Sequence, residues 1–422
     1  MDDITLKQVI ADQRENFFSK KKLIQRDLDL DVYLKTRQVV VISGIRRCGK
    51  SSLLYLIKNK MHLKKEQIVY FNFDDERLIN FKIGDFNKLY ALHIELFRPD
   101  ISKLIWFLDE IQNIHNWEKF VNRIYEKQMK IFVTGSNASL LSSEISTALT
   151  GRNMTIYLMP FSFKEYLRIK NISFSDSLLT TEQKAMLTGE FYQYVETGGF
   201  PQVLQENNMS LISFYYQDIL YRDIVARYSL QQTEELKNLS LFISSNISRL
   251  YSYRQLLTIC GVNSVSTIKK YLNYFEQSFL FYFVKKFDYS IKKQILNPKK
   301  IYLSDTGFYG KIGFRSTHDA GHLLENIAFL SLKRSGKEIY YHKHKYECDF
   351  VIKKNLNISE AIQVSAQITN ATTRKREFEG LYEALNVYDL EQGLILTENE
   401  EGVEVYKSKK IVIKPLWQWL VQ

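Results

Sequence analysis

The stretch that most constrains the fold is residues 39–52, which read VVVISGIRRCGKSS. Four apolar residues lead into a glycine turn, and the following LLYLIKNK has the composition of a helix. The four fixed positions of the pattern G-x-x-x-x-G-K-[ST] are filled by Gly44, Gly49, Lys50 and Ser51. A strand, a turn and a helix in this order point backbone N–H groups at an anion. We therefore predict an α/β fold with a parallel sheet and a phosphate-binding loop.

Each fixed residue of this loop has a role in nucleotide binding. The glycines let the backbone curl, Lys50 would contact the β- and γ-phosphates, and the Ser51 hydroxyl would ligate Mg²⁺. The alternative is a chance glycine turn, but the apolar run before it and the helix after it favour ATP and Mg²⁺ as ligands. The residues expected to contact the nucleotide are Gly44, Ile45, Arg46, Arg47, Cys48, Gly49, Lys50, Ser51 and Ser52.

Length and charge limit the remaining possibilities. A chain of 422 residues predicts two or three domains. Lysine and arginine exceed the acidic residues by 58 to 47, for a net charge of +11, which is compatible with a nucleic-acid partner but does not require one.

Cysteine usage and hydropathy bear on the compartment. The three cysteines lie far apart in sequence, which indicates a reducing compartment and no metal cluster. No apolar stretch approaches the ~18 residues of a membrane span, and the N-terminus is charged where a signal peptide is apolar. We expect a cytoplasmic protein with no membrane partner.

A second motif supports the nucleotide interpretation. The run KLIWFLDEIQNI carries apolar residues directly into Asp109 and Glu110, as expected for a strand buried on both faces with acids at its carboxyl end. Asp109 would hold Mg²⁺ and Glu110 would activate the attacking water. An ordinary strand that ends in two solvated acids is the alternative, and the preceding phosphate-loop motif makes it the weaker one.

Two further segments supply candidates around the γ-phosphate. The apolar strand in KIFVTGSNA should lie beside the phosphate-loop strand, so that Ser136 or Asn137 at its tip contacts the phosphate; the alternative is that one of them caps the next helix. Arg152, in LTGR, is a candidate γ-phosphate contact, and the alternative is an arginine that binds carbonyls at a helix C-terminus.

Residues 39–167 resemble the AAA+ ATPases, in particular a prokaryotic branch that pairs the ATPase with a C-terminal region of poorly known function. The resemblance rests on GIRRCGKSSLL, IWFLDEIQNIHNWE, FVTGSNASLL, LTGR, MPFSFKEYL, GGFPQV, YRDIVARY and KIYLSDTGFYG. It implies ATP and Mg²⁺ binding by Lys50, Ser51 and Asp109, catalysis by Glu110, and a sensor role for Ser136 or Asn137. It also implies a γ-phosphate role for Arg152, within the subunit or across an interface.

We expect five segments along the chain. They are an N-terminal helical segment at 1–36, an AAA+ core at 37–170, a helical lid-like region at 171–245, a winged-helix-like segment at 246–318, and a restriction-endonuclease-like α/β domain at 319–422. In the fourth segment, a helix, a turn, a helix and two strands follow one another, as in a winged helix. Basic residues there that are available to DNA phosphates are Lys269, Lys270, Lys285, Lys286, Lys292 and Lys293, with Asn273 beside them. A solvated face on a domain used for protein contacts is the alternative.

The last segment resembles the PD-(D/E)xK nuclease fold but lacks part of its site. Glu325, Asp349 and the strand EAIQVS occur in the right order, whereas the Glu-x-Lys position reads Gln363-Val364-Ser365. Serine cannot stabilise developing charge as lysine does, so we expect a degenerate site that binds without cleaving. Lys353 or Lys354 from a neighbouring strand is a conceivable replacement for the lysine, and Glu360 is an alternative acid.

The sequence therefore predicts an ATPase that couples ATP hydrolysis to a module that binds nucleic acid or a protein partner. Two alternatives stay open. One is a slowly hydrolysing switch that acts through protein contacts, and the other is an ATP-gated nuclease.

Overall fold

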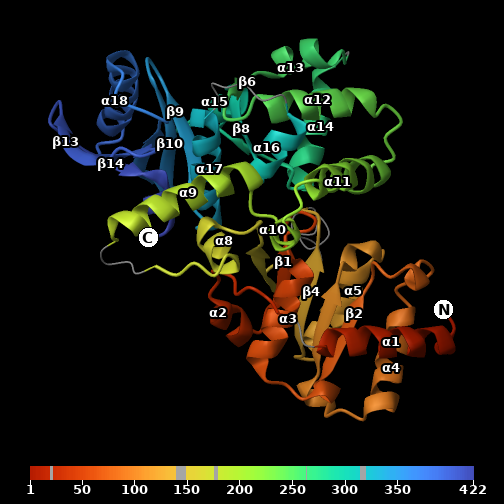
Figure 1. The fold of residues 1–422 in the computed structure, drawn as a ribbon. Helices are drawn as coiled ribbons and strands as arrows, with labels where there is room; N and C mark the ends of the chain where they lie inside the picture. Colours follow the sequence, from red (N-terminus) through yellow and green to blue (C-terminus); the bar gives the residue numbers. More distant parts are fainter. Residues whose placement is uncertain (20–21, 139–148, 175–178, 263, 314–319) are drawn as a thin grey trace. The chain divides into compact units, whose positions relative to one another are not determined.

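The computed structural model describes the chain except for residues 20–21, 139–148, 175–178, 263 and 314–319 (Figure 1). The chain forms two compact units, Met1–Met159 and Pro160–Gln422. The finer division into five segments stays a prediction. Among the helices of the described residues, none is long and apolar enough to cross a membrane.

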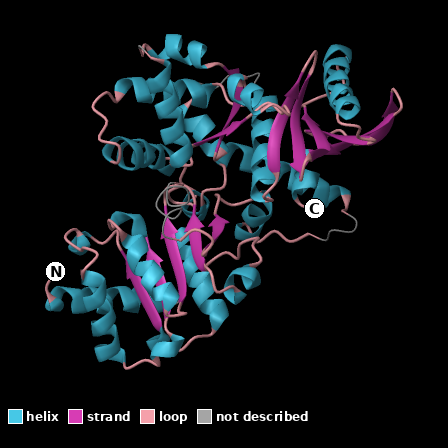
Figure 2. Ribbon diagram, turned by 180° about the vertical axis from the view of Figure 1, so that it is seen from behind, coloured by secondary structure: helices cyan, strands magenta, loops and turns pink. Residues whose placement is uncertain are grey.

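The first unit is built on a sheet of five parallel strands, drawn in magenta in Figure 2. Its strand order is β2 (Ile68–Asn72), β3 (Ile105–Asp109), β4 (Lys130–Gly135), β1 (Val39–Ser43) and β5 (Asn153–Tyr157). The predicted parallel α/β architecture is confirmed, and β4 lies beside β1 as expected. Because the strands are parallel, their carboxyl ends meet at one edge, where polar residues can gather.

The helices of this unit are α1 (Asp3–Phe18), α2 (Leu30–Lys35), α3 (Lys50–Met61), α4 (Asp85–Phe97) and α5 (Trp117–Glu126). The helical stretch expected over 4–36 is therefore two separate helices. Asp29 begins the second one, because its side chain accepts a hydrogen bond from the Asp31 backbone N–H. Before it, the extended chain carries Arg26 toward the phosphate loop.

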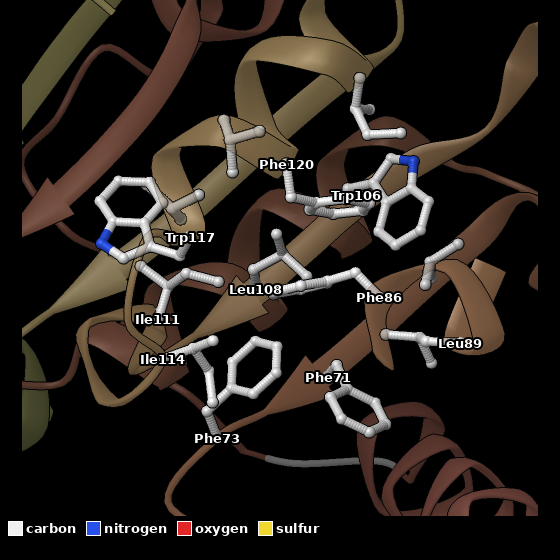
Figure 3. Close-up of a cluster of buried hydrophobic side chains, with 14 of the residues drawn as sticks. Phe71, Phe73, Phe86, Leu89, Trp106, Leu108, Ile111, Ile114, Trp117 and Phe120 are labelled. Atoms are coloured by element: carbon white, nitrogen blue, oxygen red, sulfur yellow. The ribbon is translucent and has the colours of Figure 1, made fainter. Parts of the chain in front are cut away.

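A large aromatic cluster fixes β3 in the first unit (Figure 3). Trp106 and Leu108 of β3 are fully buried in it. Phe86 of α4 stacks on Phe120 of α5 with ring centroids 4.1 Å apart, and Trp106 meets Phe120 edge to face at 5.2 Å. Phe107, on the opposite face of the strand, stacks on a phenylalanine of β4. With both faces packed, the position of Asp109 at the end of β3 is set by the core.

The second unit begins with helices and then forms a small sheet. The helices are α8 (Phe163–Ile169), α9 (Thr181–Thr197), α10 (Pro201–Glu206), α11 (Leu211–Asp218), a π-helical turn (Ile219–Ala226), α12 (Glu234–Ser245), α13 (Tyr253–Cys260) and α14 (Val265–Gln277). Three antiparallel strands form the small sheet in the order β6 (Leu250–Tyr251), β8 (Lys299–Leu303) and β7 (Phe281–Val284), and β6 precedes α13 in the chain. The two strands expected after α14 are present. Their connection also contains the short helix α15 (Ile291–Leu296), which the Ser290 side chain caps.

The C-terminal part of the second unit carries a mixed sheet of six strands. Helix α16 (Thr306–Ile312) leads to α17 (Ala320–Arg334), and α18 (Ala371–Val387) and α19 (Leu416–Leu420) come later. The strand order is β13 (Gly402–Tyr406), β14 (Lys409–Pro415), β12 (Gln392–Thr397), β11 (Asn357–Val364), β10 (Glu347–Lys354) and β9 (Glu338–Lys343). Strands β9, β10 and β11 are antiparallel, and β12 runs parallel to β11. Strand β13 was not expected from the sequence, because its valines point to solvent at the sheet edge.

Two segments singled out by the resemblance, GGFPQV and KIYLSDTGFYG, meet in the second unit. The Asp305 carboxylate accepts hydrogen bonds from the backbone N–H groups of Gly199, at 2.7 Å, and Gly307, at 2.9 Å. A Cβ atom on Gly198 would lie 1.8 Å from an Asp305 oxygen, so that position requires glycine. Burial raises the pKa of Asp305 to about 7. These residues hold the unit together rather than form a catalytic site.

Candidate nucleotide-binding site

The loop between β1 and α3 has the geometry that its glycines predict. Gly49 precedes the first residue of α3 with φ of 101°, a conformation that disfavours side chains. A Cβ atom on Gly44 would lie 1.9 Å from the carbonyl oxygen of Leu158. Both fixed glycines are therefore required by the backbone. The loop ends at the N-terminus of a twelve-residue helix, where free N–H groups and the helix dipole favour an anion.

Lys50, the first residue of α3, is buried but loosely held. Its Nζ donates to the carbonyl oxygens of Gly44 and Ile45, each at 3.3 Å, and lies 3.6 Å from Oε1 of Glu110. Only 4% of the side chain is exposed. Carbonyl oxygens are weak partners for a buried ammonium compared with phosphate oxygens. The structure thus places a buried cation inside the loop, in contact with carbonyl oxygens that phosphate oxygens can replace.

Asp109 ends β3 and lies fully buried at the same edge of the sheet. The hydroxyl of Thr134 donates to its Oδ1, the hydroxyl of Tyr70 donates to Oδ2 at 3.2 Å, and the Ser51 side chain also hydrogen-bonds to it. Burial, together with the neighbouring charge of Glu110, raises the pKa of Asp109. A carboxylate beside the Ser51 hydroxyl offers the oxygen ligands that Mg²⁺ prefers, so these residues fit that ion.

Glu110 follows Asp109 in a left-handed conformation, with φ of 50°, and its backbone N–H donates to the Thr134 hydroxyl at 2.9 Å. Its Oε2 accepts a hydrogen bond from Nε2 of Gln112 at 2.5 Å. Burial alone would raise the pKa of Glu110, but the charge of Lys50 and the Gln112 hydrogen bond hold it below its usual value. Glu110 is thus an ionised carboxylate, as a group that activates water must be.

Ser136 and Asn137 follow β4 and are buried at this edge. Nε2 of Gln112 lies 3.4 Å from Oγ of Ser136, and Oγ of Ser43 donates to the Asn137 carbonyl oxygen at 3.3 Å. Gln112 therefore contacts both Ser136 and Glu110, so Ser136 lies close to the acid. The sequence did not reveal this proximity. The choice between the two as a phosphate contact stays a prediction.

Arg152 is not brought to the phosphate loop. It precedes β5, and its carbonyl oxygen accepts from the N–H of Val39 at the first residue of β1, whereas the loop follows the last residue of that strand. At about 3.3 Å per residue, five residues of β1 separate the two edges by roughly 16 Å. The guanidinium instead contacts Asn122 and Glu126 of α5. A γ-phosphate role within the same subunit has no support in this geometry, and a role across an interface stays a prediction.

Several residues around the site carried no sequence signal. Arg26 donates to the carbonyl oxygens of Cys48, at 3.0 Å, and Met159, at 2.6 Å, and so holds the loop from outside. Gln112 and Tyr70 contact the two acids. Gln112 lies within IWFLDEIQNIHNWE, and Arg26 and Tyr70 lie outside the segments that carry the resemblance; for none of the three does the sequence reveal the tertiary partner.

The structure also gathers the nuclease-like residues of the second unit. Glu325 of α17, Asp349 of β10, and Gln363 and Ser365 at the end of β11 line one cavity of about 650 Å³. Oε1 of Gln363 accepts from the Asp349 N–H at 3.1 Å, and its Nε2 donates to Glu377 at 2.5 Å. The four residues named from the sequence thus lie together, and their assignment to a nuclease-like site stays a prediction. Glu377, from α18, was not foreseen.

The lysine of this cavity comes from an unexpected strand. Lys353 pairs with Glu338 at 3.1 Å, and Lys354 is exposed at the end of β10. Glu360, the alternative acid, pairs with Lys337 at 2.7 Å. None of these three residues lines the cavity. Its buried ammonium is instead that of Lys300, on β8.

Two family models match consecutive parts of the chain. A model described as an AAA domain matches residues 36–167, and a model described as a domain of unknown function matches residues 188–318. The first match covers the phosphate loop, both acids of β3 and the tip of β4.

Two relatives match nearly the whole chain. An uncharacterized protein of Methanocaldococcus jannaschii, MJ1544, is 34% identical over 99% of this chain and 95% of its own length. An uncharacterized protein of Haemophilus influenzae is 32% identical over 85% of this chain and 88% of its own. Among solved structures, the Walker-type ATPase PABY2304 of Pyrococcus abyssi is similar at 16% identity and a TM-score of 0.43, over 69% of this chain and 98% of that one.

Proposed function

The chain belongs to a family of prokaryotic AAA-domain proteins that includes MJ1544 of Methanocaldococcus jannaschii, and from this premise we propose that it hydrolyses ATP at the loop between β1 and α3. The hydrolysis is coupled to the second unit, which binds nucleic acid or a protein partner.

One observation carries the proposal. The Lys50 ammonium and the Glu110 carboxylate, which lie far apart in sequence, come within 3.6 Å at the carboxyl edge of the sheet, and Asp109 lies beside them. Phosphoryl transfer to water needs a cation and two acids around an anion-binding loop. Here the pKa of Asp109 is raised and that of Glu110 is lowered, so the two acids can take different roles.

Each side chain then has a defined task. Lys50 exchanges its two carbonyl partners for phosphate oxygens, and Ser51 and Asp109 hold Mg²⁺. The ion neutralises phosphate charge when it is bound. Glu110, ionised by its surroundings, orients the water and accepts its proton. Thr134 keeps both acids in register, since its hydroxyl contacts the Asp109 carboxylate and the Glu110 backbone.

The test is ATP turnover by the wild type and by Glu110→Gln. We expect the variant to bind ATP with unchanged affinity and to lose about 10²–10⁴-fold in turnover, the usual contribution of a general base. A matched control is Glu118→Gln, a partly exposed acid in the first turn of α5. Turnover by Glu110→Gln at the wild-type rate would falsify the assignment of Glu110.

The hydrogen bond from Gln112 favours a second candidate, a slow ATP-dependent switch. This bond occupies Oε2 of Glu110, the group that must contact water. If it limits hydrolysis, Gln112→Ala should raise single-turnover hydrolysis several-fold, whereas an unchanged or lower rate would assign Gln112 to support of the active carboxylate. Slow wild-type turnover that DNA does not alter would favour the switch.

Two features support the proposed coupling module. The succession β6, α13, α14, β7, β8, with the sheet order β6–β8–β7, resembles that of a winged helix. The succession α17, β9, β10, β11, α18, β12 matches the αβββαβ order of the restriction-endonuclease-like fold. The second unit would thus join a nucleic-acid-binding motif to a nuclease-like core.

DNA is the partner that the charge pattern favours. Lys269, Lys270 and Asn273 lie exposed on α14, and lysines 285, 292 and 293 are exposed along the β7–β8 connection. We expect Lys269→Glu with Lys270→Glu to weaken binding of duplex DNA and to reduce its dependence on salt, measured by fluorescence anisotropy. Lys237→Glu, at an exposed position in α12, is a control for added negative charge away from α14, with half the charge change of the double variant. Equal affinities of the two variants and the wild type would favour a protein partner.

A further inference from the structure

The buried lysine of the second unit lies among three carboxylates. Nζ of Lys300 is 2.7 Å from Asp349 Oδ1, 2.8 Å from Glu347 Oε1 and 3.0 Å from Glu325 Oε1. Only 1% of the lysine side chain is exposed. We call Glu325, Glu347 and Asp349 the carboxylate cluster. An ammonium has three N–H groups, and here each has a carboxylate oxygen at hydrogen-bonding distance.

The cluster is also satisfied on its other sides. The Tyr302 hydroxyl donates to Glu325 at 2.7 Å, and the Val364 backbone N–H donates to Oδ2 of Asp349 at 2.9 Å. Lys343 pairs with Oε2 of Glu347 at 3.0 Å. Every carboxylate therefore has a second donor besides Lys300. This arrangement meets the requirement that a buried charge be paired and hydrogen-bonded.

These residues do not fit a divalent cation, which the nuclease-like fold would imply. Mg²⁺ requires near-octahedral oxygen ligands at about 2.0–2.1 Å, and the cluster instead converges on a nitrogen. The Gln363 carbonyl oxygen accepts from Asp349, and the Ser365 hydroxyl donates to the Gln367 carbonyl oxygen. Within the described part of the chain, no group of three or more His, Cys, Asp or Glu side chains is arranged to hold a metal ion.

Lys300 also belongs to a different sheet from its partners. It lies on β8 of the three-stranded sheet, whereas Glu347 and Asp349 lie on β10 of the six-stranded sheet and Glu325 on α17. The Asn326 side chain, next to Glu325, bonds both the N–H and the carbonyl oxygen of Leu303 on β8. The contacts of Lys300 thus fasten the small sheet to the C-terminal sheet.

We propose that the Lys300 ammonium is the resident cation of the carboxylate cluster, and that the cluster is a metal-independent joint between the two sheets rather than a divalent-cation site. The Lys300 ammonium supplies the positive charge that a lysine at the position of Ser365 would provide in a PD-(D/E)xK site. It also occupies the space between the carboxylates where a metal ion would bind. Loss of the ammonium would leave the buried carboxylates of Glu325 and Asp349 without their cation, so the joint depends on it.

The test is thermal unfolding of the full chain without nucleotide, with and without millimolar Mn²⁺. We expect Mn²⁺ to change the melting temperatures of the wild type and of Asp349→Asn by the same amount, because the cluster does not bind the ion. Lys300→Met should lower the melting temperature by roughly 5–10 °C, the size expected when one partner of a buried ion pair is removed. Lys343→Met removes a more exposed lysine from the same cavity and should lower it by less than about 2 °C.

A charge-balanced variant separates lost compensation from lost packing, and it covers the case in which Lys300→Met does not fold. Lys300→Met combined with Glu325→Gln and Asp349→Asn removes the cation and two acids with little change in volume. We expect it to regain at least half of the lost melting temperature. A wild-type Mn²⁺ shift that Asp349→Asn abolishes would overturn the proposal. So would equal melting temperatures of Lys300→Met and Lys343→Met, or no recovery in the triple variant.

Discussion

Each unit of this protein buries one lysine among acids, and the two lysines are held very differently. Lys50 rests on two carbonyl oxygens at 3.3 Å and has its carboxylate at 3.6 Å. Lys300 touches three carboxylates at 2.7–3.0 Å. Both side chains are almost fully buried, so exposure does not distinguish them.

The difference lies in the kind of oxygen that each cation contacts: backbone carbonyl oxygens and the Glu110 carboxylate for Lys50, and three carboxylates for Lys300. A lysine that must bind a phosphate gains from leaving weak carbonyl partners, whereas one bound to three carboxylates has nothing to gain from a further anion. The loop around Lys50 also supplies backbone N–H groups and a helix N-terminus. A lysine at a helix N-terminus beside carbonyl oxygens thus marks the proposed ligand site, and a lysine bound by three carboxylates marks the joint.

The largest expected effect separates the two lysines by activity. Lys50→Met should lower ATP turnover by about 100-fold or more, because the charge that stabilises the phosphates is lost. Lys300→Met should change turnover by less than about twofold, since it alters no group of the nucleotide site. Steady-state phosphate release measures both. A turnover loss of similar size in both variants would break the comparison.

The next effect concerns stability of the joint. Asn326→Ala removes the amide that bonds both backbone groups of Leu303, at 2.8 and 3.1 Å. Leaving two buried groups unpaired should lower the unfolding free energy by about 2–4 kcal/mol. Denaturant unfolding followed by circular dichroism measures it. Asn273→Ala, an exposed position on α14, should cost under about 0.5 kcal/mol, and equal losses would refute the role of Asn326.

The smallest effect is a pH dependence within the second unit. The pKa of Asp305 rises from 3.8 to about 7 on folding because of burial. A raised folded pKa means that the folded state binds the proton more tightly, so this contribution to stability is full below about pH 4 and is lost as the pH rises through 7. Asp305→Asn should therefore flatten the fall of unfolding free energy between pH 5 and 8, by at most about 1.4 kcal/mol per pH unit. An unchanged slope would mean that Asp305 does not titrate in this range.

The sequence determined the local features of both sites. Gly44, Gly49 and Lys50 fixed the loop because their spacing permits one backbone path into a helix, and the apolar run before Asp109 required a strand buried on both faces. The order of Glu325, Asp349 and Gln363 along the C-terminal elements likewise predicted that they converge. In each case the information lies in a few residues close together in the chain or in the order of its strands.

Only the tertiary structure decided which distant side chains complete those sites. It placed Arg152 at the opposite edge of the sheet from the phosphate loop, aimed Gln112 at Glu110, and carried Lys300 from β8 into the carboxylate cluster. No motif encodes these contacts, because they depend on which strands become neighbours and which faces they turn inward. A lysine in KKIYL reads as one more basic residue until the fold buries it beside three acids.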